Sequence, residues 1–209
     1  SITDNAGTLN TSTSFATMEV LTGGSGSDTL TGDSGNDLFV LSGAEAGSVA
    51  GMDFSEMEAI SGGISGTDEV TGTSGDDDFA LSGANAGSVA GMTFSSIETL
   101  SGGAGNDEFT VASGIVFNGT INGDGDSDSL IATDGVNAWE ISADNTGTLN
   151  TSTSFTTMDV LTGGSSATDT LTGTAGDDSF VLSGSEAGSV AAMSFSEMEI
   201  IAGGGSAGN

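Results

Sequence analysis

The sequence contains no Lys, Arg, His, Cys, Pro or Tyr, and these absences exclude several classes of function. Nucleic acids and anionic membranes bind basic surfaces, which a chain without cationic side chains does not have. Without His or Cys there is no zinc site, no disulfide and no nucleophile activated by histidine. No apolar run approaches the roughly 18 residues that span a membrane. We therefore expect no nucleic-acid partner and no membrane insertion.

The charge that is present is entirely negative. Of the 209 residues 30 are Asp or Glu, which gives a formal net charge of −30. Such acidity is typical of disordered chains, but here 35 % of the residues are hydrophobic and they recur at regular intervals. We expect a folded chain whose counterions come from outside. Hard cations that prefer oxygen ligands fit this requirement, Ca²⁺ before Mg²⁺.

Internal repeats organise the whole chain. Residues 24–63 align without a gap on residues 64–103, and residues 165–204 give a third copy. Residues 4–24 recur almost verbatim as residues 144–164. Each copy divides into two related halves, so the elementary unit is about 20 residues long, a length typical of repeat architectures.

Glycine-rich turns alternate with short β-branched or aromatic runs, which indicates strands. A helix is excluded because Gly interrupts every apolar run within about six residues. The sequence predicts an all-β fold, a parallel β-solenoid (β-helix or β-roll) with about ten rungs of roughly 20 residues. At about 4.8 Å between strands the rod would be about 50 Å long.

We expect one continuous solenoid over residues 1–209 without terminal caps, so that flanking repeats or like subunits stack end to end. The expected units are a partial repeat at 1–22, repeats at 23–62 and 63–101, an extra rung at 102–122, repeats at 123–162 and 163–202, and the start of the next repeat at 203–209.

A nonapeptide carries the chemistry. Residues 23–31 (GGSGSDTLT) and 102–110 (GGAGNDEFT) fit the pattern GGxGxDxUx, in which U is a large apolar residue. Residues 32–40 follow the first copy in tandem, with only the second Gly replaced. Looser copies lie at 63–71, 72–80 and 173–181, with irregular ones around Asp128 and Asp169.

At these residues the sequence resembles the RTX, or haemolysin-type, calcium-binding repeats of secreted bacterial proteins. The companion stretch FSxMExIxGG, as in Phe54–Gly63, resembles the repeats of very large bacterial surface adhesins. The resemblance implies a parallel β-roll or β-helix whose glycine-rich turns bind several Ca²⁺ ions, and an extracellular or cell-surface location. Because the nonapeptides come in pairs separated by about 22 other residues, the number of ions stays open.

The residue types suit this chemistry. Gly at the first, second and fourth positions permits turns with positive φ in which carbonyl oxygens converge on an ion, and Asp at the sixth position adds charge. Alternatively, each Asp hydrogen-bonds the backbone of its own turn. The candidate metal ligands are Asp28, Asp37, Asp68, Asp77, Asp107, Asp128, Asp169 and Asp178, with the turn backbone of Gly23, Gly26, Gly32, Gly35, Gly72, Gly75, Gly102, Gly105, Gly173 and Gly176.

A second set of acids precedes an apolar residue in the same way: Glu19, Glu58, Glu98, Asp159 and Glu199. They are either ligands or solvated edge charges that prevent lateral aggregation. Around Trp139, Asn137 replaces the usual Asp, so we expect no strong ion site there.

Sequence spacing predicts two columns of side chains along the rod. One column holds Glu19, Asp37, Glu58, Asp77 and Glu98; the other holds Asp28, Asp68, Asp107, Asp128 and Asp169, with Ser48, Ser88, Thr148 and Ser189 at intervening rungs. Two carboxylates one rung apart repel by about 3.5 kcal/mol at an effective dielectric constant of 20. Summed over the rod, this rivals the stability of an ordinary domain, about 5 to 15 kcal/mol. Cations are therefore expected to be part of the fold.

Paired acids such as Asp76 and Asp77 suggest a glycosidase. An active site is normally unique, however, and these acids recur from copy to copy, so we expect no catalytic residues and no enzyme. The favoured function is a calcium-stabilised rod in a bacterial adhesin stalk or extracellular fibre, a role compatible with a surface or carbohydrate target. The alternatives are a filament subunit that stacks head to tail, and a secretion and folding module of a secreted enzyme.

Overall fold

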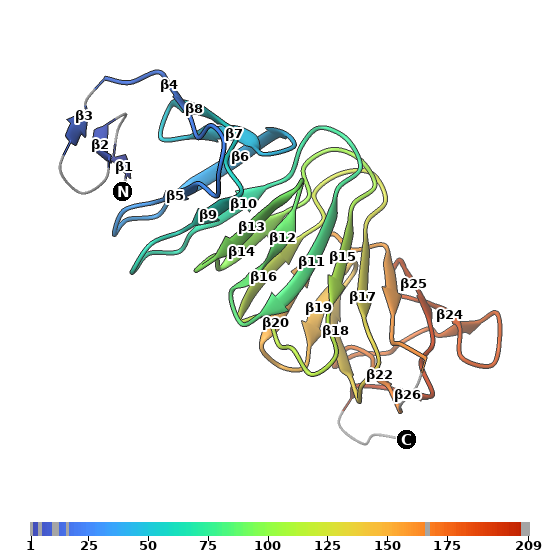
Figure 1. Ribbon diagram of the computed structural model, residues 1–209. Coiled ribbons are helices and arrows are strands. Elements are labelled where there is room, and N and C mark those ends of the chain that lie inside the picture. The colour runs from blue at the N-terminus through green and yellow to red at the C-terminus, as the bar shows by residue number, and fades with distance from the viewer. Residues whose placement is uncertain (1, 4–5, 10–12, 16, 166–167, 206–209) are drawn as a thin grey trace.

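The computed structural model (Figure 1) describes residues 2–3, 6–9, 13–15, 17–165 and 168–205. The described residues form 26 strands and no helix, which confirms the expected all-β solenoid. Accordingly, this part of the chain has no helix long and apolar enough to cross a membrane. The units expected at 1–22 and 203–209 lie partly outside the described residues.

The strands belong to three sheets, and two of these build the rod. A three-stranded antiparallel sheet at the N-terminal end contains β1 (Ile2–Thr3), β2 (Ala6–Leu9) and β3 (Thr13–Phe15). The 12-stranded sheet contains, in spatial order, β4 (Val20–Thr22), β8 (Met52–Ser55), β7 (Ala46–Val49), β6 (Leu38–Gly43), β10 (Glu69–Thr71), β14 (Thr99–Ser101), β16 (Gly119–Asn122), β20 (Thr153–Thr156), β19 (Thr146–Leu149), β18 (Ala138–Ala143), β22 (Thr170–Thr172) and β26 (Ile200–Ala202). The 11-stranded sheet contains β5 (Thr29–Thr31), β9 (Ala59–Ser61), β13 (Met92–Ser95), β12 (Ala86–Val89), β11 (Asp78–Gly83), β15 (Glu108–Val111), β17 (Ser129–Ala132), β21 (Val160–Thr162), β25 (Met193–Ser196), β24 (Gly188–Val190) and β23 (Val181–Leu182).

The chain crosses between the 12-stranded and 11-stranded sheets at each glycine-rich turn or bend. In the repeat at 23–62 it visits the 11-stranded sheet with β5, the 12-stranded sheet with the meander β6–β7–β8, and the 11-stranded sheet again with β9. Pairing between successive turns is parallel, as between β10 and β6, whereas pairing inside the meander is antiparallel. Three visits per repeat correspond to one and a half turns of the solenoid.

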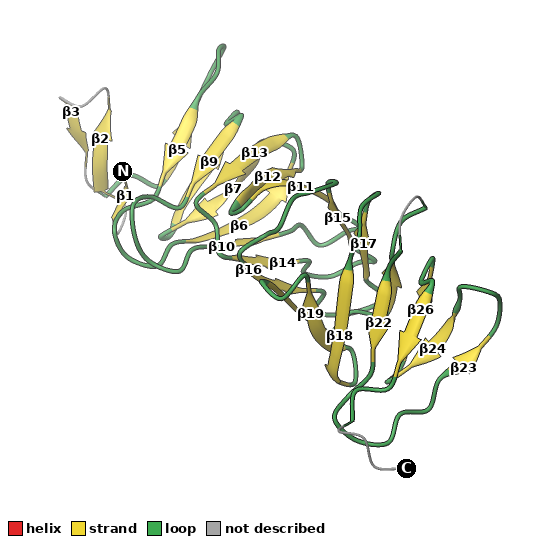
Figure 2. Cartoon of the chain, turned by 90° about the horizontal axis from the view of Figure 1, so that it is seen from below, coloured by secondary structure: helices red, strands yellow, loops and turns green. Residues whose placement is uncertain are grey.

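This path corrects the expected rungs. The solenoid has fewer turns than the ten expected, because the second half of each repeat adds two antiparallel strands to one sheet instead of completing a turn. The strands are nevertheless stacked along one axis (Figure 2), and twelve of them at about 4.8 Å span about 55 Å. The predicted length therefore agrees with the structure although the predicted coiling does not.

The core lies between the two large sheets. Along β6 and β11 exposed and buried side chains alternate, as expected for strands with one face in the core. Phe79 stacks on Phe109 with ring centroids 4.6 Å apart. Trp139 contacts Phe155 edge to face at 6.1 Å. The first contact links the parallel strands β11 and β15 of successive turns, whereas the second lies within the meander β18–β19–β20.

Candidate calcium-binding turns

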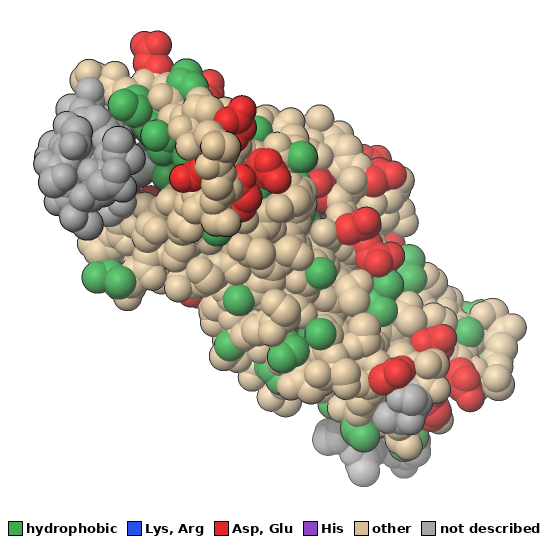
Figure 3. Space-filling view, in the orientation of Figure 1, with side chains coloured by type: hydrophobic (Ala, Val, Ile, Leu, Met, Phe, Trp, Pro, Cys, Tyr) green, Lys and Arg blue, Asp and Glu red, His purple; other side chains and the backbone are tan. Residues whose placement is uncertain are grey.

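The glycine-rich turns bring aspartates to the start of a strand in each sheet. Asp68 directly precedes β10, and Asp107 directly precedes β15. Most of these turn aspartates are buried, Asp128 and Asp169 completely so, with 0 % of their surface exposed. Buried charges in proteins are normally paired with an opposite charge, but the chain has no basic side chain to pair with them. Acidic side chains follow the length of the rod without a basic neighbour (Figure 3).

Each turn aspartate is joined to the turn stacked on it. The N–H of Asp37 donates to Oδ1 of Asp68, and the N–H of Asp77 donates to Oδ1 of Asp107, both at 2.8 Å. The N–H of Asp107 donates in turn to Oδ1 of Asp128, again at 2.8 Å. We call these runs carboxylate ladders. One oxygen of each of these carboxylates, the one that accepts from the preceding turn, is thereby committed to the main chain.

The ladders differ from the two predicted columns, which are wrong. Glu19, Asp37 and Glu98 precede strands of the 12-stranded sheet, whereas Glu58 and Asp77 precede strands of the 11-stranded sheet. The second predicted column is divided in the same way, with Asp28, Asp107 and Asp128 at the 11-stranded sheet and Asp68 and Asp169 at the 12-stranded sheet. The physical reason is the one and a half turns per repeat, which puts equivalent residues of consecutive repeats in opposite sheets. Ser48, Ser88, Thr148 and Ser189 lie in the central strands of the meanders, not at the turns.

Neighbours in a ladder are instead about 30 residues apart, or 21 where β15 and β16 follow each other without a meander. The ladders are Asp28–Glu58, Asp37–Asp68–Glu98, Asp77–Asp107–Asp128–Asp159 and Asn137–Asp169–Glu199. Glu58, Glu98, Asp159 and Glu199 thus end the ladders, accepting the N–H of the preceding Asp, while Glu19 is exposed.

The second carboxylate oxygen separates two kinds of turn. In the first kind it is capped by the second residue of the same turn. Asp37 accepts the N–H of Asp33 at 2.8 Å, Asp77 accepts that of Thr73 at 2.6 Å, and Asp178 accepts that of Thr174 at 2.9 Å. These three follow the alternative in which the Asp satisfies its own turn.

In the second kind of turn the oxygen has no partner. The second residue there has a positive φ, 101° at Gly103 and 106° at Gly164, and its N–H does not reach the carboxylate. As a result Oδ2 of Asp107, Asp128 and Asp169 is buried without any hydrogen bond. A buried carboxylate oxygen without a hydrogen bond destabilises the fold unless a group from outside the chain, such as a cation, contacts it.

Asn137 shows what surrounds this position. Its Nδ2 donates to the carbonyl oxygens of Gly135 at 3.1 Å and Thr133 at 3.4 Å in its own turn, and to that of Gly163 at 3.0 Å in the next turn. Three carbonyl oxygens therefore converge on the end of the side chain. An amide satisfies them by donating hydrogen bonds, but an aspartate adds a negative oxygen, which only a cation or a proton offsets. The amide gives a physical reason why no strong ion site was expected at Asn137.

Burial raises the pKa of the ladder carboxyls. For Asp107 burial is the largest cause, the N–H of Asp77 lowers the pKa, and the charge of Asp128 raises it again, to about 6. Burial also raises the pKa of Asp37, Asp68, Asp128 and Asp169. Hydrogen bonds from Thr174 lower the pKa of Asp178. The unpartnered aspartates thus carry their negative charge at a cost, which a bound cation removes.

The donor set fits Ca²⁺. Within the described part of the chain no three acidic side chains gather around one point, so an ion would take one carboxylate oxygen and complete its shell with carbonyl oxygens and water. Ca²⁺ accepts such mixtures of oxygen ligands readily.

The predicted glycines are needed mainly because their Cα atoms pack closely against the turn aspartate, and less often for a positive φ. A Cβ on Gly72 would lie 2.7 Å from Oδ2 of Asp77, and Gly32, Gly102 and Gly173 have equally little room. Among the fourth-position glycines, Gly26 and Gly105 have positive φ as predicted, whereas Gly35, Gly75 and Gly176 do not. Gly23 likewise packs against Asp28.

Sequence reasoning missed the hairpin tips of the meanders. Nδ2 of Asn85 donates to Oε1 of Glu98 at 2.9 Å, and Nδ2 of Asn145 donates to Oδ1 of Asp159 at 2.8 Å. The corresponding tips of the other repeats carry Glu45 and Glu186, which have no amide to donate. The only signal in the sequence is that Asn alternates with Glu at one repeat position.

A family model, the RTX calcium-binding nonapeptide repeat (4 copies), matches residues 16–43, 93–114 and 163–184, about a third of the chain. The fold and the turns together thus define a calcium-binding β-solenoid repeat protein. The chain contains RTX calcium-binding nonapeptide repeats, whose ligand is Ca²⁺ and which typically occur in secreted proteins. No curated protein and no solved structure matches the chain. Asp68, Asp77 and Asp128 lie outside the matched segments but hold the same place in the ladders.

Proposed function

We propose that this chain is a calcium-stiffened rod of the bacterial cell surface or extracellular matrix, a segment of an adhesin stalk or fibre. One observation carries the proposal: Oδ2 of Asp107, Asp128 and Asp169 is buried and unpartnered in a chain that has no basic side chain. The fold leaves these charges for an external cation to neutralise. We propose all eight turn aspartates as ligands, with the carbonyl oxygens of their turns completing the shell. Asp37, Asp77 and Asp178 bind through a remaining lone pair of a carboxylate oxygen that also accepts a hydrogen bond.

The shape supports a role as a spacer. Both large sheets run the length of the molecule over a shared core, and the two ends of the chain lie at opposite ends of the rod (Figure 1). External calcium at millimolar concentration binds only the folded turns and so favours folding by mass action. In a compartment with little free calcium the same acids repel one another. The mechanism therefore fits a protein that folds after export.

The direct test is thermal unfolding of the isolated 209-residue chain at low salt, in EDTA and in millimolar Ca²⁺, with bound ions counted by titration calorimetry. We expect calcium to raise the midpoint by about 10 °C, since each ion at about ten times its Kd adds about 1.4 kcal/mol of stability and several ions contribute. Small-angle scattering in calcium should report a rod about 55 Å long. Equal midpoints in EDTA and calcium, with no heat of binding, would contradict the proposal.

A second candidate is a filament whose subunits, or flanking repeats, stack end to end. The outermost strands of the two large sheets expose large apolar side chains, Val20 on β4, Val181 and Leu182 on β23, and Ile200 on β26. Sheet edges of this kind pair readily with further strands. We expect calcium-dependent growth in analytical ultracentrifugation and its loss in Val20→Glu. A chain that stays monomeric in calcium at high concentration would exclude stacking of like subunits.

A further inference from the structure

Not every glycine-rich turn stacks on another glycine-rich turn. At four places its neighbour is the bend that follows a buried Phe, with the pattern Phe-x-x-x-acid. We call these places mixed steps; they are Asp28 with Glu58, Asp68 with Glu98, Asp128 with Asp159, and Asp169 with Glu199. The ladder hydrogen bond continues across each of them, for example from the N–H of Asp169 to Oε2 of Glu199 at 2.6 Å. The bend therefore takes the place of a turn in the stack.

The third residue of each bend has a left-handed backbone. The residues are Glu56, Ser96, Thr157 and Glu197, with φ between 52° and 57°. Residues other than Gly seldom adopt this conformation. Because the side chain differs from bend to bend while φ does not, the retained feature is the direction of the main chain. The consequence is found at the carbonyl group of this residue.

That carbonyl oxygen faces the first glycine of the turn and the aspartate of the same turn. A Cβ built on Gly123 would lie 2.5 Å from Oδ2 of Asp128 and 2.5 Å from the carbonyl oxygen of Thr157. The distance between the two oxygens is therefore at most twice 2.5 Å. Two ligands of one Ca²⁺, each at roughly 2.4 Å from the ion, are likewise at most about twice that distance apart.

The other mixed steps repeat this arrangement. Gly23 lies between Asp28 and the Glu56 carbonyl, Gly62 between Asp68 and the Ser96 carbonyl, and Gly163 between Asp169 and the Glu197 carbonyl. Where two glycine-rich turns meet, the equivalent pair at Gly102 is Oδ2 of Asp107 and the carbonyl oxygen of Gly123. The bend thus presents a carbonyl oxygen where a nonapeptide turn would present its own.

An unpartnered atom marks the position of the ligand. Asp128 and Asp169, both at mixed steps, are completely buried, and Oδ2 of each has no hydrogen-bond partner. From the unpartnered oxygen, the carbonyl aimed beside it and the close approach of the two that the glycine permits, we propose that each mixed step binds a divalent cation, Ca²⁺ by its oxygen donors. Its ligands are Oδ2 of the turn aspartate and the carbonyl oxygen of the left-handed bend residue. The proposal rests on the function proposed above and extends it to half-sites outside the nonapeptide.

The acid of the bend has a positioning role, and at Glu98 and Asp159 both carboxylate oxygens are used for it. In each mixed step one of its carboxylate oxygens accepts the N–H of the turn aspartate. In two of the steps an Asn at the hairpin tip holds the other oxygen. The acid positions the turn against the bend. The resulting site has one carboxylate, which corresponds to the affinity range of extracellular calcium modules, about 0.1 to 1 mM.

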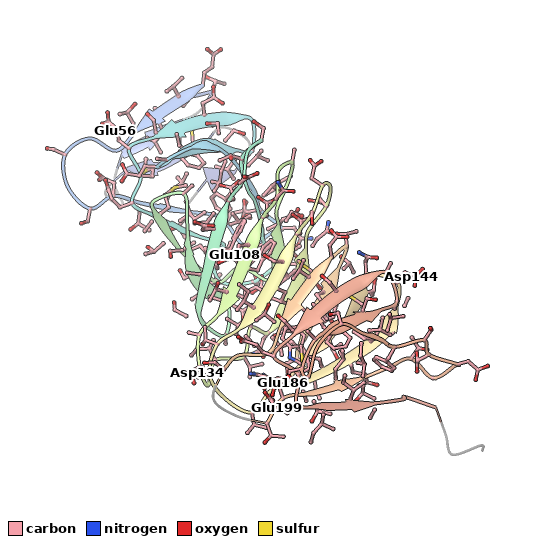
Figure 4. All side chains as sticks on the ribbon, turned by 90° about the vertical axis from the view of Figure 1, so that its right-hand side faces the viewer. Glu56, Glu108, Asp134, Asp144, Glu186 and Glu199 are labelled. Atoms are coloured by element: carbon pink, nitrogen blue, oxygen red, sulfur yellow. The ribbon has the colours of Figure 1, made fainter. Side chains whose placement is uncertain are left out.

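Asp169 allows one mixed step to be tested alone. The step on its other side is filled by the amide of Asn137, so loss of an ion at Asp169 reports only the step to Glu199. Asp169→Asn keeps an oxygen to accept the N–H of Asn137 and replaces the unpartnered oxygen with an amide. The control is Asp144→Asn, the same charge change at an exposed hairpin tip, which lies well away from Glu199 in Figure 4.

The readout is the number of calcium ions bound by the full chain in equilibrium dialysis, with melting in EDTA to verify folding. We expect Asp169→Asn to lose one ion and to melt no lower than the unsubstituted chain in EDTA, and Asp144→Asn to lose none. Gly163→Ala, whose methyl group would lie 2.1 Å from the Glu197 carbonyl oxygen and displace it from Asp169, should also lose one ion, and Gly203→Ala, with no atom within 4 Å, should not. If Asp169→Asn retains every ion, the mixed step is no site although calcium binding stands. If the unsubstituted chain binds no calcium, the proposed function itself is overturned.

Discussion

The N–H of Asp107 donates to Oδ1 of Asp128, 21 residues further along, at 2.8 Å, while Oδ2 of each carboxylate stays buried without a partner. The same side chain therefore ties two turns together and presents a charge that the protein does not neutralise. One carboxylate oxygen holds the two turns together through a hydrogen bond. The other, buried without a partner, favours the binding of a cation. Substitution and pH act differently on these two roles.

Asp107→Asn should change stability in opposite directions with and without calcium. In EDTA the substitution removes a buried charge whose pKa is raised to about 6, so at pH 7 we expect stabilisation by up to about 3 kcal/mol. In calcium the same variant lacks a ligand and should be less stable than the unsubstituted chain. Urea unfolding followed by circular dichroism measures both. Asp177→Asn, an exposed change of the same charge, should move neither by more than about 0.5 kcal/mol, and a loss of stability for Asp107→Asn in EDTA would contradict the argument.

Acidification should stabilise the calcium-free protein. Five ladder carboxyls have a pKa raised above 3.8 by burial, so in this range the folded state binds more protons than the unfolded state. Their contribution to stability is complete below pH 3.8 and is lost as the pH rises through their folded pKa values, about 6 for Asp107. Asp178, with a lowered pKa, acts in the opposite direction but alone. In EDTA we expect the melting temperature to rise from pH 7 to pH 5.

In saturating calcium the pH trend should reverse. Protons compete with the ion for the same carboxylates, so the increase in melting temperature that calcium produces at pH 7 should shrink toward pH 5. Melting curves over this pH range at constant ionic strength, with and without calcium, should therefore converge on acidification. Parallel curves would show that the ladder carboxyls are not the calcium ligands.

The fold class followed from the sequence because strand signals, glycine-rich turns and repeats agreed with one another. The coiling did not follow. A period of 40 residues contains an odd number of crossings between the sheets, and neither propensity nor periodicity records on which sheet a strand lies. Phe39 and Phe79 hold the same repeat position yet lie on β6 of the 12-stranded sheet and β11 of the 11-stranded sheet. Columns drawn from spacing alone were therefore bound to mix the two edges.

The place of the turn aspartates could be predicted from the sequence, but their hydrogen bonding could not. All eight turn aspartates lie where the nonapeptide puts them, yet Asp37 and Asp77 are capped by their own turns while Asp107 is not. The deciding residue is the second of the nonapeptide, Asp33 or Thr73 in the capped turns and Gly103 in the open one. Residue type alone does not decide, because Asp33 caps its turn whereas Asp124, with φ 69°, leaves Oδ2 of Asp128 without a partner. The outcome depends on where the N–H points, which only coordinates show.

Glu45→Asn should stabilise the calcium-free protein. Glu45 and Asn145 occupy equivalent hairpin tips with nearly equal φ, 55° and 54°, so Asn fits the backbone at least as well. At its own tip Asn145 donates to Oδ1 of Asp159 at 2.8 Å and to the carbonyl oxygen of Met158 at 2.9 Å. Glu45 offers no such donor to Glu58. We expect about 1 kcal/mol of stabilisation in urea unfolding, and Asn145→Glu should destabilise by a similar amount. No difference in either variant would mean that the tip does not act on the ladder.

Trp139→Phe should be nearly neutral for stability. Trp139 is 1 % exposed and its indole N–H has no partner, a state that destabilises by about 1 to 3 kcal/mol. The smaller Phe removes this unsatisfied donor but leaves part of the space empty, which costs a similar amount. We expect a net change below about 1 kcal/mol in urea unfolding, whereas Phe79→Ala, at an equivalent core position, should lose about 3 to 5 kcal/mol. A loss above about 3 kcal/mol for Trp139→Phe would show that the indole N–H contributes a favourable interaction in the folded protein.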